Sequence, residues 1–311
     1  MKRILITTCL IFTFVFLEAN PLSSKESDAS ETPSISATPV MNPPRRYIYP
    51  EWGFFIDGSA GYSLISNPNL SSSIWDPKGN LGATLYFGYF HTINPNMRLL
   101  AGLGASYFTS SISGDGEAPQ KEFKDIDNDT YTETLTLSNA ETRQIPIYVS
   151  IPLIFEYGNV SITRPGYYVD FGLKYSYMVN NNSQLSGYYS TKGTYQQWGV
   201  TLEDVEELGF YSERDLESNT NFKRSDLAVL GGVGITLPIS SVVILKLGLV
   251  ANLGLLDIGN NKPNKSDSGP ITSDVYNYRA KYIDNTLAVT KGTRTKYFGL
   301  ELGIYINKQL K

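Results

Sequence analysis

The sequence contains very few of the residues on which most site chemistry depends. Its 311 residues include one cysteine, Cys9, and one histidine, His91, and only 18% of the chain is charged. Cys9 lies in a segment that we expect to be removed as a signal peptide, so the mature chain is predicted to have no intramolecular disulfide or thiolate chemistry. The net charge of −4 provides no basic excess for a phosphate backbone, and nucleic acid is excluded as a partner.

The scarcity of histidine also argues against an enzyme. Barrels that act on lipid acyl chains need a base, usually a histidine, beside a nucleophile. His91 falls at the short-turn end of a predicted strand, on its lipid-facing side, and has no partner nearby. We therefore predict no catalytic residue and no organic cofactor.

The first residues, MKRILITTCLIFTFVFLEANP, have the pattern of a secretory signal. Lys2 and Arg3 form a charged start, an apolar run follows, and Ala19 is at a suitable cleavage position. The apolar run is too short for a helix that spans a membrane. We predict a signal peptide over residues 1–19. Attachment of a lipid to Cys9 is the alternative, although the apolar run continues beyond this residue.

The next segment, residues 20–50, is rich in serine, proline, glutamate and threonine. A segment of this composition cannot bury a core, and it predicts a flexible periplasmic tether. Residues 51–311 are then predicted to form one barrel domain.

The stretch QIPIYVSIPLIFEY, residues 144–157, predicts a β-strand with one apolar face. Its odd-numbered positions are large and apolar, whereas the even-numbered positions include Pro146, Pro152 and Glu156. Strand side chains alternate between two faces, so the apolar set shares one face. Proline removes a hydrogen bond from the strand ladder. We expect both prolines to face the interior with Glu156, where a bulge or bend can be tolerated.

Seven further segments repeat this alternation, with bulk on one face and glycine or charge on the other. They cover residues 52–64, 80–90, 97–108, 166–178, 225–237, 242–256 and 296–308. The first and sixth are less regular, because Phe55 shares a face with Asp57 and Leu230 with Asp226. Together the eight segments predict an all-β chain, an eight-stranded antiparallel transmembrane β-barrel with meander topology.

The connections between these segments alternate in length. Those after the second, fourth and sixth segments are short, and the others are long. Outer-membrane barrels combine short periplasmic turns with long outer loops. We therefore predict a location in the outer membrane of a Gram-negative bacterium, with both chain ends in the periplasm.

Aromatic residues gather near both predicted rims, as in the two belts at lipid–water boundaries. The periplasmic set is Trp52, Phe54, Tyr89, Phe90, Phe155, Tyr157, Tyr167 and Tyr305. The outer set is Tyr62, Tyr107, Phe108, Tyr175, Tyr177 and Tyr297.

Two alternatives to this fold stay open at the level of sequence. The barrel has ten strands if residues 131–140 or 186–200 enter the membrane, although 186–200 also fits a hairpin above it. A soluble extracytoplasmic barrel or sandwich needs a second layer over the apolar face, and no segment offers an obvious cover. Residues 201–210 fit a short helix in the fifth connection.

The segment IPIYVSIPLIFEYG, followed by GYYVDFGLKYSY, resembles the central hairpin of small eight-stranded outer-membrane β-barrel domains. These domains occur in Bacteroidota and related bacteria and include the PorT-like group. The resemblance covers residues 52–308 through the IPL strand, the glycine-rich strands and the final aromatic strand. It implies a role in protein-secretion and gliding machinery. No catalytic motif defines the group, so no functional residue is carried over.

Charged residues on the inward faces of the predicted strands form one candidate site. They are Asp57, Arg98, Glu156, Asp170, Lys174, Lys246 and Glu301. The interior of an eight-stranded barrel is filled by side chains, and both signs are present, so we expect pairing across the lumen. A narrow conduit for ions or a small solute is the alternative.

The loop DIDNDTYTE contains a second candidate site. Asp125, Asp127, Asp129 and Glu133 have the alternating spacing of oxygen ligands for calcium. The sixth and twelfth positions of the loop depart from the EF-hand pattern, since they are Thr130 and Thr136. A solvated acidic loop is the alternative.

These observations predict a non-enzymatic outer-membrane barrel that anchors, docks or displays. Its expected partners are outer-membrane lipid and a protein bound at the outer loops or the tether. A component of a secretion or solute-transport system, as in the PorT-like resemblance, and a soluble binding protein are the alternatives. The oligomeric state is left open.

Overall fold

The computed structural model describes residues 49–70, 74–217, 221–260, 272–284 and 286–307. The predicted signal peptide lies outside these residues, and so does the predicted tether up to residue 48. The domain boundaries at residues 19 and 50 therefore stay predictions.

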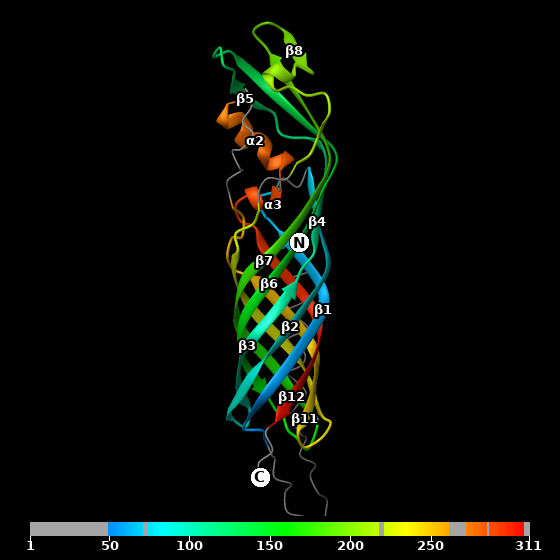
Figure 1. Ribbon diagram of the computed structural model, residues 1–311, viewed down its shortest axis with the longest axis vertical. Coiled ribbons are helices and arrows are strands. Elements are labelled where there is room, and N and C mark those ends of the chain that lie inside the picture. Colours follow the sequence, from blue (N-terminus) through cyan, green and yellow to red (C-terminus); the bar gives the residue numbers. More distant parts are fainter. Residues whose placement is uncertain (1–48, 71–73, 218–220, 261–271, 285, 308–311) are drawn as a thin grey trace, which may run out of the picture. The chain divides into compact units, whose positions relative to one another are not determined.

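Eight long strands form a closed ring of antiparallel pairs (Figure 1). They are β1 (Trp52–Ser66), β2 (Trp75–Asn94), β3 (Met97–Tyr107), β6 (Thr130–Gly158), β7 (Gly166–Tyr195), β10 (Ser225–Pro238), β11 (Val243–Gly254) and β12 (Arg294–Asn307). Each pairs with the next in this order, and β12 pairs with β1 from Gly53–Asn307 to Ser66–Arg294. The predicted eight-stranded barrel is confirmed.

The connections at one rim of the ring are short, as predicted. They cover residues 95–96, 159–165 and 239–242. The pair Gly53 and Asn307, at the start of β1 and the end of β12, lies at this same rim. We call it the short-turn rim and the opposite end the long-loop rim.

The barrel wall has the predicted alternation of faces. In β6, Ile151 and Leu153 are 57% and 51% exposed, whereas Pro152 and Glu156 between and beyond them are buried. All eight strands place large apolar side chains on the outer surface in this way. The apolar face is therefore the outside of the ring, and the mixed face lines the lumen.

Both prolines of β6 are accommodated on the side of β3. The β3–β6 ladder pairs Ala101 with Leu153 and Gly104 with Ser150, with no pair recorded between them beside Pro152. β3 itself stops at Tyr107, next to Pro146, whose carbonyl accepts a hydrogen bond from the N–H of Phe108 at 3.2 Å. A gap in this ladder needs no N–H from proline. On the other side, the β6–β7 ladder shifts register between Ile147 and Tyr148, next to Pro146, where a bulge or bend was expected.

The long connections, which the sequence predicts as loops, fold into a structured cap. β6 and β7 continue past the long-loop rim and account for residues 131–140 and 186–195, so these segments add no strands to the ring. The other elements of the cap are β4 (Ser110–Glu117), β5 (Lys121–Lys124), β8 (Val200–Glu203), the 3₁₀ turn η1 (Glu206–Leu208), β9 (Arg214–Asp215), α2 (Ser273–Ile283) and α3 (Thr286–Val289) (Figure 1).

The expected hairpin at 186–200 is present as β7 and β8, whereas the expected helix at 201–210 is only the single turn η1. Among the described residues, neither α2 nor any other helix has the length and apolar character needed to cross a membrane.

A buried ion pair holds α2 against β6 in the cap. Arg279 Nε and Nη2 donate to the two carboxylate oxygens of Glu133 at 2.6 and 3.0 Å, and Nη1 donates to the carbonyl of Gly209 at 2.8 Å. Both charged side chains are almost fully buried. The apolar side chains around them include Tyr131, Leu135, Phe210, Val275 and Leu287. The same buried cluster continues into the long-loop end of the lumen, where it includes Phe108, Tyr148 and Tyr297.

We expect Arg279→Met to release α2 from the cap. The substitution leaves the Glu133 carboxylate buried without its partner, at a cost of about 3–5 kcal/mol. Hydrogen exchange of the α2 amides measures the loss of protection. Lys281→Met changes an exposed cation of the same helix and should leave exchange within about 0.5 kcal/mol of wild type.

The double substitution Glu133→Leu with Arg279→Met removes both charges and should restore most of the protection. Unchanged exchange in Arg279→Met alone would show that the ion pair does not hold the helix.

Candidate functional site

The seven predicted lumen charges all lie on the inner face of the ring and are buried. They come from β1, β3, β6, β7, β11 and β12. The structure brings six of them together and leaves Lys174 apart.

Lys246 on β11 is the centre of this lumen charge cluster. Its Nζ lies 2.6 Å from Asp170 Oδ2, 3.3 Å from Glu301 Oε1, 3.6 Å from Asp57 Oδ2 and 3.7 Å from Glu156 Oε2. Four strands thus each contribute one carboxylate to a single ammonium group. Because the side chains of all five residues are at least nine-tenths buried, water does not screen these interactions strongly.

Gly303 makes room for this arrangement. In the ladders of β12 it pairs with Lys246 on one side and with Asp57 on the other. A Cβ atom at this position would collide with the Asp57 carboxylate and press on the Lys246 side chain. Glycine therefore lets the two charged groups meet across β12.

A second cation, Arg98, completes the cluster. Its Nη2 lies 2.7 Å from Glu156 Oε1, and its guanidinium lies 5.0 Å from the ring centroid of Tyr305. The Tyr305 hydroxyl donates to Glu156, and the Tyr168 hydroxyl donates to Glu301 at 2.8 Å. Two cations and two phenol hydroxyls therefore contact four carboxylates.

Lys174 belongs to a separate level of the lumen. Its Nζ donates to the Tyr86 hydroxyl at 3.3 Å and lies 5.3 Å from the ring centroid of Phe108. No ion pair within 4 Å includes Lys174 among the described residues. Six of the seven predicted lumen charges therefore lie in one cluster, and Lys174 lies apart from it.

Rings and aliphatic side chains fill the lumen on both sides of the charges. Phe55, Phe90 and Ile244 are buried toward the short-turn rim, and Phe108, Tyr148 and Tyr297 toward the long-loop rim. Leu100 and Leu230 are buried beside the charges, because they pair with residues two positions beyond Glu156 and Asp170 on the long-loop side. Four residues of the predicted belts, Phe90, Phe108, Tyr297 and Tyr305, are therefore inside the barrel. The alternation along each strand indicates this inward direction, because each of the four residues shares its face with inward glycine, serine or charged residues.

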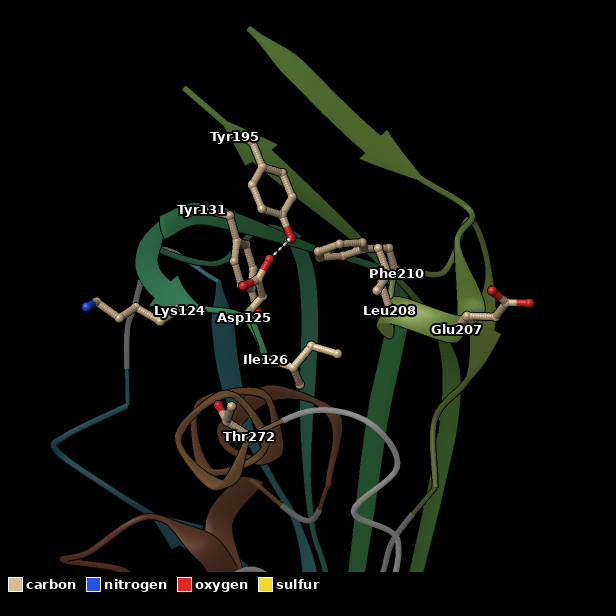
Figure 2. A pocket seen from close by; sticks show the side chains of 9 residues that line it. All are labelled: Lys124, Asp125, Ile126, Tyr131, Tyr195, Glu207, Leu208, Phe210 and Thr272. Carbon is tan, nitrogen blue, oxygen red and sulfur yellow. Dashed lines mark hydrogen bonds between the residues drawn. The ribbon is translucent and has the colours of Figure 1, made fainter. Parts of the chain in front are cut away.

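The cap contains a small pocket of about 30 Å³, roughly the volume of one water molecule in the liquid. It is lined by Lys124, Asp125, Ile126, Tyr131, Tyr195, Glu207, Leu208, Phe210 and Thr272 (Figure 2). The three aromatic rings form one wall. The ring centroid of Tyr131 lies 5.4 Å from that of Tyr195 in a stacked arrangement and 5.5 Å from that of Phe210 in an edge-on arrangement.

The wall of the pocket stays uncharged at neutral pH. Burial raises the pKa of Tyr131, and the nearby Glu133 charge raises it further. Burial and the hydrogen bond to Asp125 raise the pKa of Tyr195 to about 12. Ile126 and Leu208 line the same pocket and are 73% and 39% exposed. The pocket therefore combines an aromatic wall and two exposed apolar side chains with the charged groups of Lys124, Asp125 and Glu207.

The carboxylates of the predicted calcium loop do not converge. Asp125 Oδ1 accepts the N–H groups of Asp127 and Asp129 at 3.0 and 2.9 Å, and Asp125 Oδ2 accepts the Tyr195 hydroxyl at 3.1 Å (Figure 2). Glu133 lies within β6 and is held by Arg279. In the described part of the chain, no group of three or more histidine, cysteine, aspartate or glutamate residues is arranged to hold a metal ion.

His91 lies where the sequence places it. It is exposed near the end of β2, opposite Trp52 in the ladder and close to the short-turn rim.

We expect Lys246→Met to destabilise the barrel far more than Lys174→Met, although both lysines are buried. The first substitution leaves four carboxylates with Arg98 as their remaining cation and should cost at least about 3–5 kcal/mol. The second removes one hydrogen bond and should cost about 1.5–3 kcal/mol. Urea unfolding in lipid vesicles measures both values. Adding Asp170→Asn to Lys246→Met should recover part of the loss, and equal losses in the two single variants would contradict a cluster centred on Lys246.

Comparisons with known proteins give fold likenesses only. No protein-family model matches the chain, and no curated protein matches it. The chain is similar to the solved structures of Neisserial surface protein A (11% identity, TM-score 0.32, covering 82% of this chain and 97% of that chain) and of the outer membrane protein OprG from Pseudomonas aeruginosa (11%, 0.34, 81% and 95%).

It is also similar to Ail, the attachment invasion locus protein of Yersinia pestis, in complex with the heparin analogue sucrose octasulfate (10% identity, TM-score 0.28, covering 82% of this chain and 98% of that chain). We take no function from these likenesses. The eight-stranded barrel rests on the strand pairing of this chain, and the PorT-like resemblance stays a prediction.

Proposed function

We propose that the chain is a non-enzymatic integral outer-membrane β-barrel with a filled lumen, which anchors the folded cap and presents it for docking. The short-turn rim faces the periplasm in this proposal, and the cap lies outside the cell. This orientation follows the arrangement of short turns and long connections in outer-membrane barrels.

The observation that carries the proposal is the apolar outer surface of the ring. Large apolar side chains project outward from every strand, and many are about half exposed or more. Examples are Phe54, Leu85, Leu103, Ile151, Phe171, Ile235, Leu249 and Leu300. A soluble monomer rarely exposes an apolar surface that surrounds the whole molecule. Lipid is the environment in which such a surface is stable, so we call it the lipid belt.

The filled lumen supports anchoring over conduction. The interior of an eight-stranded barrel has room only for side chains, and the lumen charge cluster and its flanking rings occupy it. Water-accessible recognition then falls to the cap. The mouth of the cap pocket, with Ile126 and Leu208 exposed, is the part best suited to a partner.

Leu302→Lys tests the lipid belt. Leu302 is 57% exposed on β12, and a lysine there should cost about 2–4 kcal/mol if lipid surrounds it. Ile126→Lys is the matched control, because Ile126 is 73% exposed in the cap and should change stability by no more than about 0.5 kcal/mol. Urea titrations of vesicle-inserted protein give both values. Two equally small effects would indicate a soluble barrel and overturn the membrane proposal.

Conductance separates anchoring from the transport alternative. We expect the purified wild-type barrel, inserted into a planar bilayer, to give no steady ion current, because side chains fill its lumen. Insertion is verified in parallel by protease protection of the strands. A steady current from inserted protein would favour a secretion or solute-transport component instead.

A further inference from the structure

A groove on the outer surface of the barrel lies at the boundary between the lipid belt and the cap. It measures about 470 Å³ and is lined by Asn80, Leu81, Tyr107, Thr109, Ser111, Glu141 and Arg143. These residues come from β2, the end of β3, β4, β6 and the junction between β3 and β4. The three ladders between these strands hold the groove in place, so its shape is part of the barrel wall.

The two halves of the groove differ in chemistry. Leu81 and Tyr107 are 68% and 40% exposed and belong to the lipid belt. In the strand register Tyr107 pairs with Ile147, whereas Ser111 pairs with Arg143, so the guanidinium is carried beyond the edge of the belt. Arg143 is exposed, and among the described residues no ion pair within 4 Å includes it. The groove is thus apolar at the level of lipid tails, and at the level of head groups it carries one guanidinium, Arg143, and one carboxylate, Glu141.

Other cations project at the same edge of the belt. On β12, Lys296 lies two residues before the belt residue Phe298, on the same face of the strand. Arg224, just before β10, donates a hydrogen bond to the hydroxyl of Tyr177 at 3.2 Å. At the short-turn rim, Arg164 is the one exposed lysine or arginine of the described short turns, residues 95–96, 159–165 and 239–242. Arg143, Lys296 and Arg224 therefore place three cations at the edge of the belt that is nearer the cap.

We infer that this groove binds the phosphate group of a lipid in the leaflet that faces the cap, with Arg143 on the phosphate. A guanidinium matches phosphate through paired, charge-assisted hydrogen bonds. Leu81 and Tyr107 then lie along the first part of an acyl chain. The inference rests on the proposed membrane location, and it adds the class of lipid and the residue that recognises it.

The position of the groove favours a lipid over a free anion or a protein segment. Its apolar half opens at the level of the lipid belt, where acyl chains are the neighbours. A free phosphate would contact only Arg143 and would leave Leu81 and Tyr107 uncovered. Cationic side chains at the membrane edge attract anionic head groups, and this attraction is strongest within about one Debye length of the surface.

Glu141 provides an internal control of opposite sign. It lines the same groove and lies two residues before Arg143 in β6, so it projects on the same side of the strand. Its carboxylate repels a phosphate that Arg143 attracts. Removing either charge alters the groove by a similar volume, yet the two changes should affect lipid binding in opposite directions.

The test compares Arg143→Gln and Glu141→Gln with wild type. Folded protein in neutral detergent is titrated with dioleoyl phosphatidic acid, and native mass spectrometry counts the bound lipids. We expect Arg143→Gln to weaken binding about tenfold or more, because a charge-assisted hydrogen-bond pair is lost. Glu141→Gln should bind as tightly as wild type or more tightly. Dioleoylglycerol, which lacks the phosphate, should bind all three proteins equally weakly.

Two outcomes would overturn the inference. Equal phosphatidic acid binding by wild type and Arg143→Gln would show that the groove does not read the phosphate. Displacement of the lipid by inorganic phosphate at the same concentration would show that the site reads a free anion.

The proposed membrane location is tested separately, by insertion of the same variants into phosphatidylcholine vesicles. Insertion without phosphate selectivity removes only the lipid inference. Failure of wild type to insert removes the proposed function itself.

Discussion

The contact between Lys246 and four carboxylates is the constraint on which the barrel depends. The Nζ atom lies 2.6 to 3.7 Å from oxygens carried by β1, β6, β7 and β12, while Lys246 itself lies on β11. A buried charge without a partner costs several kcal/mol, so these strands must meet the lumen at one level. That requirement fixes the strand register and favours a narrow ring. In a wider barrel the carboxylates of β1 and β7 would lie too far from the same ammonium group.

The two longest strands connect this constraint to the cap. β6 holds Glu156 in the lumen charge cluster and Glu133 in the cap, where Arg279 binds it. Between them the β6–β7 ladder shifts register after Ser138, where Asn139 has a φ of 51°. This bulge exchanges the two faces of β6, so that odd-numbered side chains are buried in the cap and even-numbered ones in the barrel. One strand can therefore serve two cores.

The bulge also explains how far the sequence predicts this structure. Alternation along 144–157 gave the correct inward and outward faces, because the strand there is regular and one face is apolar throughout. The same alternation does not extend across Asn139, so Glu133 was assigned to a loop with Asp125 instead of a buried strand position. The large apolar residues Tyr131 and Leu135, each two positions from Glu133, indicate that Glu133 lies on the buried face of a strand. The partner Arg279 lies 146 positions away in α2, and no local pattern links the two.

Aromatic residue type does not predict whether a side chain faces the lipid or the lumen, for a different reason. Tyrosine and phenylalanine suit both a lipid–water boundary and the packed interior of a narrow barrel, so residue type alone does not place them. Parity does, since Tyr305 shares a face with Glu301 and Gly303, while Ile304 and Ile306 face outward. The irregular pairs Phe55 with Asp57 and Leu230 with Asp226 have the same explanation. Phe55 and Leu230 are buried apolar side chains that fill the lumen beside its charges, so each shares a face with an aspartate.

Charged residues are distributed differently over the lumen, the lipid belt and the edge of the belt. Inside the barrel, the lumen cluster brings two cations within hydrogen-bonding or ion-pair distance of four carboxylates, and buried rings pack around them. Within the lipid belt the outward face carries no such groups between Phe298 and Ile306. Exposed charge begins again at the belt edge, with Arg143 and Lys296, and continues into the cap. The proposed recognition therefore falls where the barrel wall leaves the lipid belt, and beyond it.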